Sequence, residues 1–270
     1  MSAFETAPED ASLRETVACT IKKGVIGHCS AACTGWMVLV LDGVSTRVVT
    51  PVLGMYDLME ERVTLVESLE KKRQPFPEME VVYIVSPTAE SVAQICQDFD
   101  AGRAQCMYGD VHIFFLSPLP DEQMAVLGKC TQLVQRIKTL KELNLAFLAV
   151  ESQVFHLDMP RTFSRLSPGS SAEACQTIAE RLATVCITLN EYPLIRIKSD
   201  NSVMSQLAQA MQVRPARAVR EMIRDCAVIL QPRVPRAECD GTVHREEPGL
   251  VVSWTDGEEI QQKPRYAAPA

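Results

Sequence analysis

Apolar residues in the first 150 positions gather in short runs separated by stretches of helical spacing. Met37–Leu41 and Val111–Leu116 are almost continuously apolar, and Met79–Val85 is nearly so. Continuous apolar runs of this length are typical of strands whose two faces are both covered. Val63–Leu69 is a shorter, mixed run, and Leu145–Val150 completes the set of strands that we expect in the first part of the chain.

Two helical patterns lie between these runs. Thr88 is a suitable N-cap for a helix whose apolar residues share one face, and Asp121 opens a second pattern that stays in phase as far as Leu140. Strands that alternate with helices in this way predict an α/β fold built on a doubly wound, mostly parallel sheet.

A second unit of the same class begins near Ser152. Ser170 and Glu173 form a capping box at the start of a long helix, and Pro193 blocks its continuation. The other elements that the pattern predicts are strands at Val154–Asp158, Leu194–Lys198 and Cys226–Leu230 and a helix at Val203–Gln212. These are too few to cover both faces of an open sheet, so we expect an incomplete α/β second domain.

The pattern divides the chain into four parts. Residues 1–33 form an N-terminal segment, 34–144 the first α/β domain, and 145–230 the incomplete second domain. Residues 231–270 show no sustained period, and we expect a divergent, loosely ordered tail there.

Composition narrows the class of protein. The hydrophobic fraction is 47% and the charged fraction 23%, as in globular proteins. The net charge of −7 argues against a nucleic-acid partner. No apolar run approaches the ~20 residues that span a bilayer, and the acidic stretch Met1–Ser12 is unlike a secretory signal. We therefore expect a cytoplasmic protein.

Ten cysteines raise the question of a metal site. The tightest cluster is His28-Cys29 followed by Cys33, and it lacks the second pair that zinc sites of this kind require. We interpret it as a reduced loop and expect no metal.

Asp42 follows the first strand, at the edge of the sheet where ligands gather in α/β folds. A small phosphotransfer or hydrolase domain using Asp42 is therefore one functional hypothesis. No phosphate-binding glycine motif accompanies it, and His112 lies inside an apolar strand, where a buried, hydrogen-bonded histidine is the expected state. Because no nucleophile can be paired with a base, we favour a binding protein without enzymatic activity or cofactor, and Asp42 as a polar strand-end residue.

An ordered series of short segments points to a particular family. The segments are Trp36–Asp42, Thr64-Leu65-Val66-Glu67, Val81–Pro87, Leu145–Leu148, Glu151–Phe155 and Leu189–Pro193. In this order they resemble the N-terminal part of Sec1/Munc18 proteins over roughly residues 20–200. The resemblance implies an arch-shaped, three-domain binder of syntaxins and other SNARE proteins, with a five-stranded parallel sheet in its first domain and no catalysis.

The resemblance implies a face that grips closed syntaxin. Arg47 and Glu67 match charged residues of that face. The basic run at Lys71 to Arg73 is interpreted as a solvated loop, with partner contact by Lys71 and Arg73 as the alternative. Gly54 and Gln74 stand where the family pattern has charged residues, which weakens the expectation of tight binding.

The resemblance also implies a pocket for the N-terminal peptide of syntaxin. In the family it is built from the helix that precedes the Leu-Ala-Phe-Leu segment. The matching positions are Met124, Ile137, Leu140 and Glu142. Met124 stands in place of an aromatic residue, and a flexible methionine can fill similar space.

Family chains are more than twice as long. Their second domain is discontinuous, and residues 145–230 resemble only its first half. Their third domain templates SNARE assembly. We therefore expect a truncated syntaxin-binding protein of vesicle docking and exocytosis, attached peripherally to membranes only through syntaxin. A decoy that occupies syntaxin without promoting fusion is the alternative within this class, and the sequence does not identify which syntaxin is bound.

Overall fold

The computed structural model describes residues 11–33, 35–100, 102, 105–166, 171–189, 194–197, 202–213, 226–232 and 250–256. The chain divides into two compact units. Unit 1 comprises Met1–Met159 and Arg181–Leu189, and unit 2 comprises Pro160–Glu180 and Asn190–Ala270. This division follows packing, and the four-part division inferred from the sequence stays a prediction.

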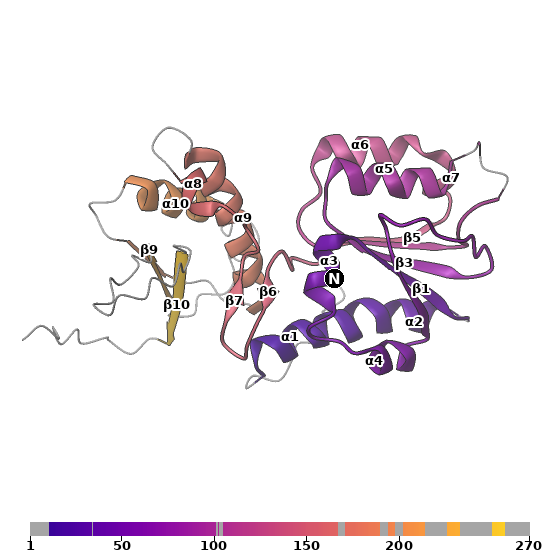
Figure 1. Ribbon diagram of the computed structural model, residues 1–270, viewed down its shortest axis with the longest axis horizontal. Helices are drawn as coiled ribbons and strands as arrows, with labels where there is room; N and C mark the ends of the chain where they lie inside the picture. The colour runs from indigo at the N-terminus through magenta and orange to yellow at the C-terminus, as the bar shows by residue number, and fades with distance from the viewer. Residues whose placement is uncertain are drawn as a thin grey trace, which may run out of the picture. The chain divides into compact units, whose positions relative to one another are not determined.

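Unit 1 is built on a five-stranded parallel sheet with the order β2-β1-β3-β4-β5 (Figure 1). The strands are β1 (Met37–Leu41), β2 (Val63–Ser68), β3 (Glu80–Val85), β4 (Val111–Phe115) and β5 (Ile137–Glu142). Every residue of β1 and β4 is buried. The predicted α/β fold with a mostly parallel sheet is therefore confirmed for this unit.

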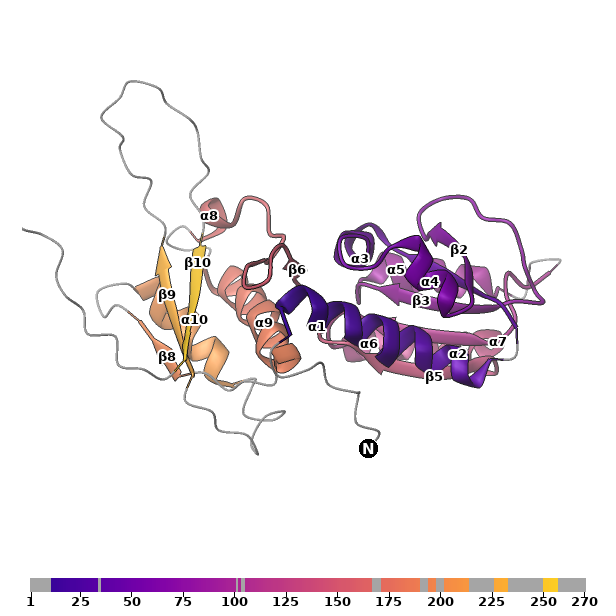
Figure 2. The ribbon, with the colours of Figure 1, turned by 90° about the horizontal axis from the view of Figure 1, so that it is seen from below.

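Helices cover both faces of this sheet. One face carries α5 (Ala89–Asp98), α6 (Asp121–Lys129) and α7 (Thr131–Val134) (Figure 1). The other carries a continuous N-terminal helical segment made of α1 (Leu13–Cys19), η1 (Thr20–Gly27) and α2 (His28–Ala32), which Figure 2 shows along its length. Two short helices, α3 (Gly43–Val49) and α4 (Met55–Glu60), connect β1 to β2.

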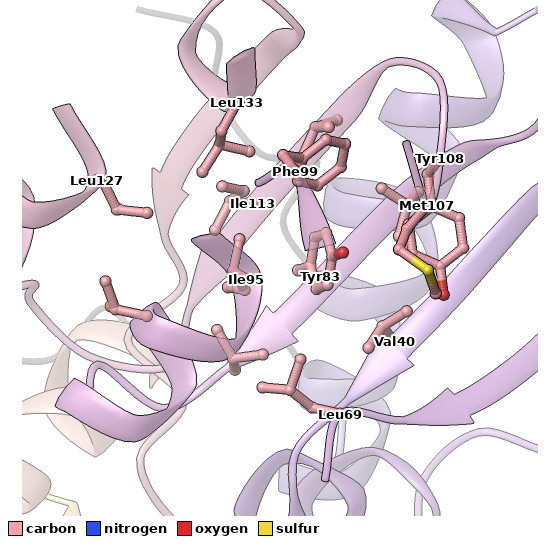
Figure 3. Close-up of a cluster of buried hydrophobic side chains, with 14 of the residues drawn as sticks. Val40, Leu69, Tyr83, Ile95, Phe99, Met107, Tyr108, Ile113, Leu127 and Leu133 are labelled. Carbon is pink, nitrogen blue, oxygen red and sulfur yellow. The ribbon is translucent and has the colours of Figure 1, made fainter. Parts of the chain in front are cut away.

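The core between the sheet and α5–α6 contains large rings (Figure 3). Tyr83 and Tyr108 meet edge to face, with ring centroids 6.2 Å apart. Phe99 and Ile113 are fully buried beside them. Burying a side chain of this size contributes about 1.5–3 kcal/mol relative to exposure, so this cluster fixes how α5 packs on the sheet.

The helix predicted from Asp121 to Leu140 is present as α6 and α7, with a break at Cys130, and the prediction is wrong beyond Val134. After α6 and α7, residues 137–142 form the edge strand β5. Ile137 and Leu140 have helical spacing, yet the same spacing suits this strand. The ladder between β4 and β5 shifts register after Val111, so Ile137 pairs with Val111 and Leu140 with Ile113. Partners in a parallel ladder point to the same face of the sheet, so both side chains face α5–α6.

The end of unit 1 is a small antiparallel hairpin of β6 (Leu148–Ala149) and β7 (Phe155–His156). The strand predicted at Leu145–Val150 is reduced to β6, and the one predicted at Val154–Asp158 to β7. Phe147 and Phe155 stack edge to face here, with centroids 6.0 Å apart.

Unit 2 has a separate three-stranded sheet, in the order β10-β9-β8. Its strands are β8 (Leu194–Arg196), β9 (Cys226–Pro232) and β10 (Leu250–Asp256), and its helices are α8 (Thr162–Arg165), the first half of α9 (Ser171–Leu189) and α10 (Ser202–Val213). β10 corrects the expectation that the tail lacks structure throughout. Its antiparallel pairing with β9 comes from distant residues, which local periodicity does not reveal. The predicted capping serine, Ser170, and Pro193 lie outside the described residues.

Candidate partner-binding site

Asp42 is an N-cap buried in hydrogen bonds. Its Oδ1 accepts from the backbone nitrogens of Val44 (3.1 Å) and Ser45 (2.7 Å). Its Oδ2 accepts from the Ser86 nitrogen (2.6 Å) and the Ser91 hydroxyl (3.2 Å). The residue is 4% exposed. Both carboxylate oxygens are therefore committed to holding α3 and the start of α5, which leaves no oxygen oriented for phosphoryl transfer.

His112, Cys29 and Cys33 were weighed as ligands or catalytic groups, and all three are buried. His112 is buried, with its Nδ1 2.9 Å from the Thr139 hydroxyl and its Nε2 3.1 Å from Glu80. This confirms its interpretation as a buried histidine with hydrogen-bond partners. Cys29 and Cys33 are free thiols, and residues 28–32 form α2 rather than the expected loop. Within the described ranges, no group of three or more His, Cys, Asp or Glu residues could hold a metal ion.

Glu67 near the end of β2 is connected to the core by a set of polar contacts that we call the Arg73 network. The Tyr108 hydroxyl donates to Glu67 Oε2 at 2.6 Å and accepts from Arg73 Nη1 at 3.4 Å. Arg73 also donates to both oxygens of Asp98, at 2.9 and 3.1 Å. The Tyr83 hydroxyl donates to Asp98 at 2.7 Å.

The Arg73 network keeps its charges paired inside the protein. The side chains of Arg73 and Asp98 are 7% and 3% exposed. Burial alone would lower the pKa of Arg73, but Asp98 and the two tyrosines reverse this and raise it. Burial also raises the pKa of Tyr83 and of Tyr108, with contributions from Asp98 and Glu67 respectively. Both phenols therefore remain neutral donors to the carboxylates.

The structure corrects the interpretation of the basic run as uniformly solvated. Lys71 and Lys72 are exposed, whereas the Arg73 guanidinium points inward to Asp98. Arg73 is linked to Glu67 through the Tyr108 hydroxyl. Asp98 and Tyr108 were not among the predicted site residues, because they lie far from Arg73 in the sequence.

Arg47 on α3 makes an ion pair within unit 1. Its Nε and Nη2 both donate to Asp158 Oδ2, at 2.9 and 2.6 Å. Its side chain is 53% exposed and that of Asp158 is 24% exposed. Nothing in the sequence pattern linked these two residues, which lie 111 positions apart.

The four residues predicted for the peptide pocket lie at the α6 and β5 elements. Ile137, Leu140 and Glu142 share the side of β5 that faces α5–α6, since they pair in register with Val111, Ile113 and Phe115. Met124 lies on α6 and is 44% exposed, and Leu140 is 38% exposed. We call these four residues the α6–β5 face.

Two of these four residues also make contacts that stabilise unit 1. Ile137 packs against the core cluster. Glu142 Oε1 accepts a hydrogen bond of 3.0 Å from the Leu119 nitrogen, just before α6.

Glu67 belongs to β2 and Leu140 to β5, so the two candidate surfaces lie at opposite edges of the sheet. The expectation that a helix holds Ile137, Leu140 and Glu142 is wrong, because these three residues lie on the strand β5.

Comparison with known proteins decides the family. A sequence profile of the Sec1 family matches residues 37–261. The chain belongs to the Sec1 family. The match continues through residues 231–261, where the sequence analysis expected divergence. The resemblance noted in the N-terminal part is thus confirmed and extended.

Two relatives and one solved structure illustrate the similarity. "Protein transport protein sec1" of Dictyostelium discoideum is 41% identical over 180 residues, which is 66% of this chain and 30% of the relative. "SNARE-interacting protein KEULE" of Arabidopsis thaliana is 31% identical over 193 residues, 68% of this chain and 29% of the relative. The Unc18–syntaxin 1 complex of Monosiga brevicollis matches with a TM-score of 0.67 and 28% identity, covering 77% of this chain and 37% of that chain.

This Sec1-family chain therefore spans about 30% of the length of those curated relatives. None of its described helices combines the length and apolar character of a membrane span. The parallel sheet with helices on both faces is the fold that it shares with the solved family structures.

Proposed function

We propose that this Sec1-family chain binds a syntaxin-type SNARE protein and acts in vesicle docking and exocytosis. The observation that carries the proposal is the family match over residues 37–261. A likeness in fold and sequence to a family member whose structure was determined with syntaxin 1 supports it further. Binding is favoured over catalysis because both oxygens of Asp42, the one catalytic candidate, are occupied by hydrogen bonds.

The first proposed contact surface surrounds Glu67. Its carboxylate is half-buried and held through Oε2 by Tyr108, so its position is fixed before a partner arrives. A preorganised carboxylate loses little conformational freedom when it accepts a hydrogen bond from a basic group on the partner. Lys71 is exposed nearby in the chain and is the second charge that we assign to this surface.

The second proposed contact surface is the α6–β5 face. Leu140 and Met124 present half-exposed apolar side chains there. An apolar side chain from the N-terminal peptide of a syntaxin that becomes buried against them gains about 2–3 kcal/mol. Glu142 adds a carboxylate for a cation or an amide at the rim.

A pair of variants tests the α6–β5 face. Leu140→Asp places a charge where the peptide's apolar residue should be buried, and its own side chain is exposed enough to leave the fold intact. Ile137→Asp is a poorer choice, because Ile137 packs against the core. Val150→Asp is the matched control, since Val150 is also exposed, by 48%, but lies in neither proposed surface.

The measurement is isothermal calorimetry with a syntaxin N-terminal peptide. We expect Leu140→Asp to abolish binding and Val150→Asp to bind like the natural chain. Equal affinity of the Leu140→Asp variant and the natural chain would remove the α6–β5 face from the proposal. A panel of syntaxins from different membranes then tests the assignment to exocytosis, which requires preference for a plasma-membrane syntaxin.

Peripheral association with membranes through syntaxin forms part of the same proposal. Flotation with vesicles that do or do not carry an anchored syntaxin tests it. Flotation with bare vesicles would contradict syntaxin as the attachment.

A further inference from the structure

Asp158 is held from two sides by arginines. Arg47 from α3 donates twice to its carboxylate. Arg181 from α9 donates to the carbonyl oxygens of Leu157 and Asp158. The Asp158 nitrogen donates to His156 Nδ1 at 2.8 Å. We call these four contacting residues, Arg47, His156, Asp158 and Arg181, the Asp158 clamp; all of them belong to unit 1.

The backbone at Asp158 needs such support. Its φ of 50° lies in the left-handed region, which is unfavourable for residues other than glycine, although aspartate tolerates it better than most. A conformation of this kind persists when the surrounding contacts specify it. Arg47 fixes the side chain, and Arg181 fixes the two carbonyl groups on either side of the turn.

The Asp158 carboxylate contacts Arg47, and its charge also acts on Arg181, which donates to carbonyl oxygens and not to the carboxylate. Burial lowers the pKa of Arg181, Asp158 opposes this effect, and Arg47 adds to it through repulsion. Asp158 is therefore the shared counter-charge. Both the Nε and Nη2 donors of Arg47 point at one oxygen of Asp158, so these two donors of a half-exposed side chain are engaged within unit 1.

We propose that Arg47 is a positioning residue: it supports partner binding by holding the segment Phe155–Asp158 through Asp158, and it does not contact the SNARE protein directly. This inference rests on the proposed function. It changes the role that the family resemblance implies for Arg47, and it adds Asp158 and Arg181 to the residues on which binding depends.

Neutral substitutions at the two ends of the ion pair separate the two roles. Arg47→Gln removes the cation, and Asp158→Asn removes the anion while keeping a side chain that tolerates a positive φ. The affinity of the natural chain, both single variants and the double variant for the soluble helical part of a syntaxin is measured by calorimetry. Lys138→Gln with Asp110→Asn removes another ion pair of unit 1, 3.3 Å long and exposed, and serves as the control.

If Arg47 acts by positioning, the effects of Arg47→Gln and Asp158→Asn on the binding free energy should not be additive. Arg47→Gln alone should weaken binding about five- to tenfold, within the range of coupling between contacting residues. In the Asp158→Asn background it should have no further effect. An equal loss in both backgrounds would show direct contact with the partner and overturn the proposal, as would unchanged affinity of the Arg47→Gln chain. The control pair should bind normally.

Hydrogen exchange without any partner separates this inference from the proposed function. Arg47→Gln should speed the exchange of the amides in Phe155–Asp158, while exchange in β1 and β4 stays slow. Unchanged exchange in Phe155–Asp158 would overturn the clamp even if the chain binds syntaxin. If the natural chain binds no syntaxin, the proposed function fails, and the exchange result alone decides whether Arg47 holds this segment.

Discussion

The hydroxyl of Tyr108 donates a hydrogen bond of 2.6 Å to Glu67 on β2. Tyr108 is fully buried and its ring packs against that of Tyr83. The carboxylate at the edge of the sheet is therefore coupled to the aromatic core, and the same hydroxyl accepts from Arg73. Substitutions within the Arg73 network should therefore affect the surface around Glu67 that we propose for contact with a SNARE partner.

Removal of one partner of the buried Arg73–Asp98 ion pair should strongly lower the free energy of unfolding. Asp98→Asn leaves the buried Arg73 guanidinium without its counter-charge, and we expect a loss of about 3–5 kcal/mol in the free energy of unfolding. The double variant Arg73→Met with Asp98→Asn should lose less than either Arg73→Met or Asp98→Asn alone, since no unpaired charge remains. Urea unfolding of the four chains measures this, and additive losses would contradict a coupled pair.

The buried phenols predict a loss of stability at alkaline pH. The pKa of Tyr108 is raised in the folded state, so the unfolded chain releases this proton first. The contribution is fully present below the ordinary tyrosine pKa of about 10 and is lost as the pH rises through the folded pKa. Above about pH 10, the unfolding free energy of the Tyr108→Phe variant should therefore fall less steeply than that of the natural chain. An identical alkaline slope in both chains would count against the Tyr108 assignment.

Asp42 should matter for stability and not for chemistry. Asp42→Ala removes the N-cap of α3 together with the contacts to Ser86 and Ser91, and we expect a loss of about 2–3 kcal/mol. Incubation of the natural chain with acetyl phosphate and Mg²⁺ should leave the intact mass unchanged. A mass increase of one phosphoryl group that Asp42→Ala abolishes would revive the phosphotransfer hypothesis.

Cys29 should be unreactive in the folded chain. Burial, with a smaller contribution from Glu80, raises the pKa of this thiol to about 12, and the thiolate is the reactive form. At pH 8, peptide mapping after iodoacetamide treatment should find Cys29 unlabelled in the native state and labelled in urea. Rapid native labelling would mean that the α2 region opens readily.

The sequence predicted the buried strands and the α5 helix well because their signals are local. Continuous apolar runs identify β1, β3 and β4, and Thr88 accepts from the Ser91 nitrogen as an N-cap should. β5 was predicted to be a helix because a register shift with β4 allows helical spacing on one face of a strand. The strand β10 pairs with β9 along its whole length, and no local pattern specifies such a partner.

The candidate site was predictable only in part. Family resemblance pointed to Arg47 and Glu67, but their contacts depend on residues distant in sequence. Asp158 lies 111 residues from Arg47, and Tyr108 lies 41 residues from Glu67. The inward orientation of the Arg73 side chain likewise depends on Asp98, 25 residues away. Pairings over such separations arise when the helices and strands pack together, and a local pattern does not specify them.

The central claim is that the chain binds a syntaxin-type SNARE protein through unit 1. Calorimetric titration with the soluble part of a syntaxin, prepared with and without its N-terminal peptide, tests it most directly. The account predicts saturable binding of both preparations, tighter with the peptide, and Leu140→Asp should remove only that difference. Absence of saturable binding by either preparation, for a natural chain that is folded by circular dichroism, would contradict the account.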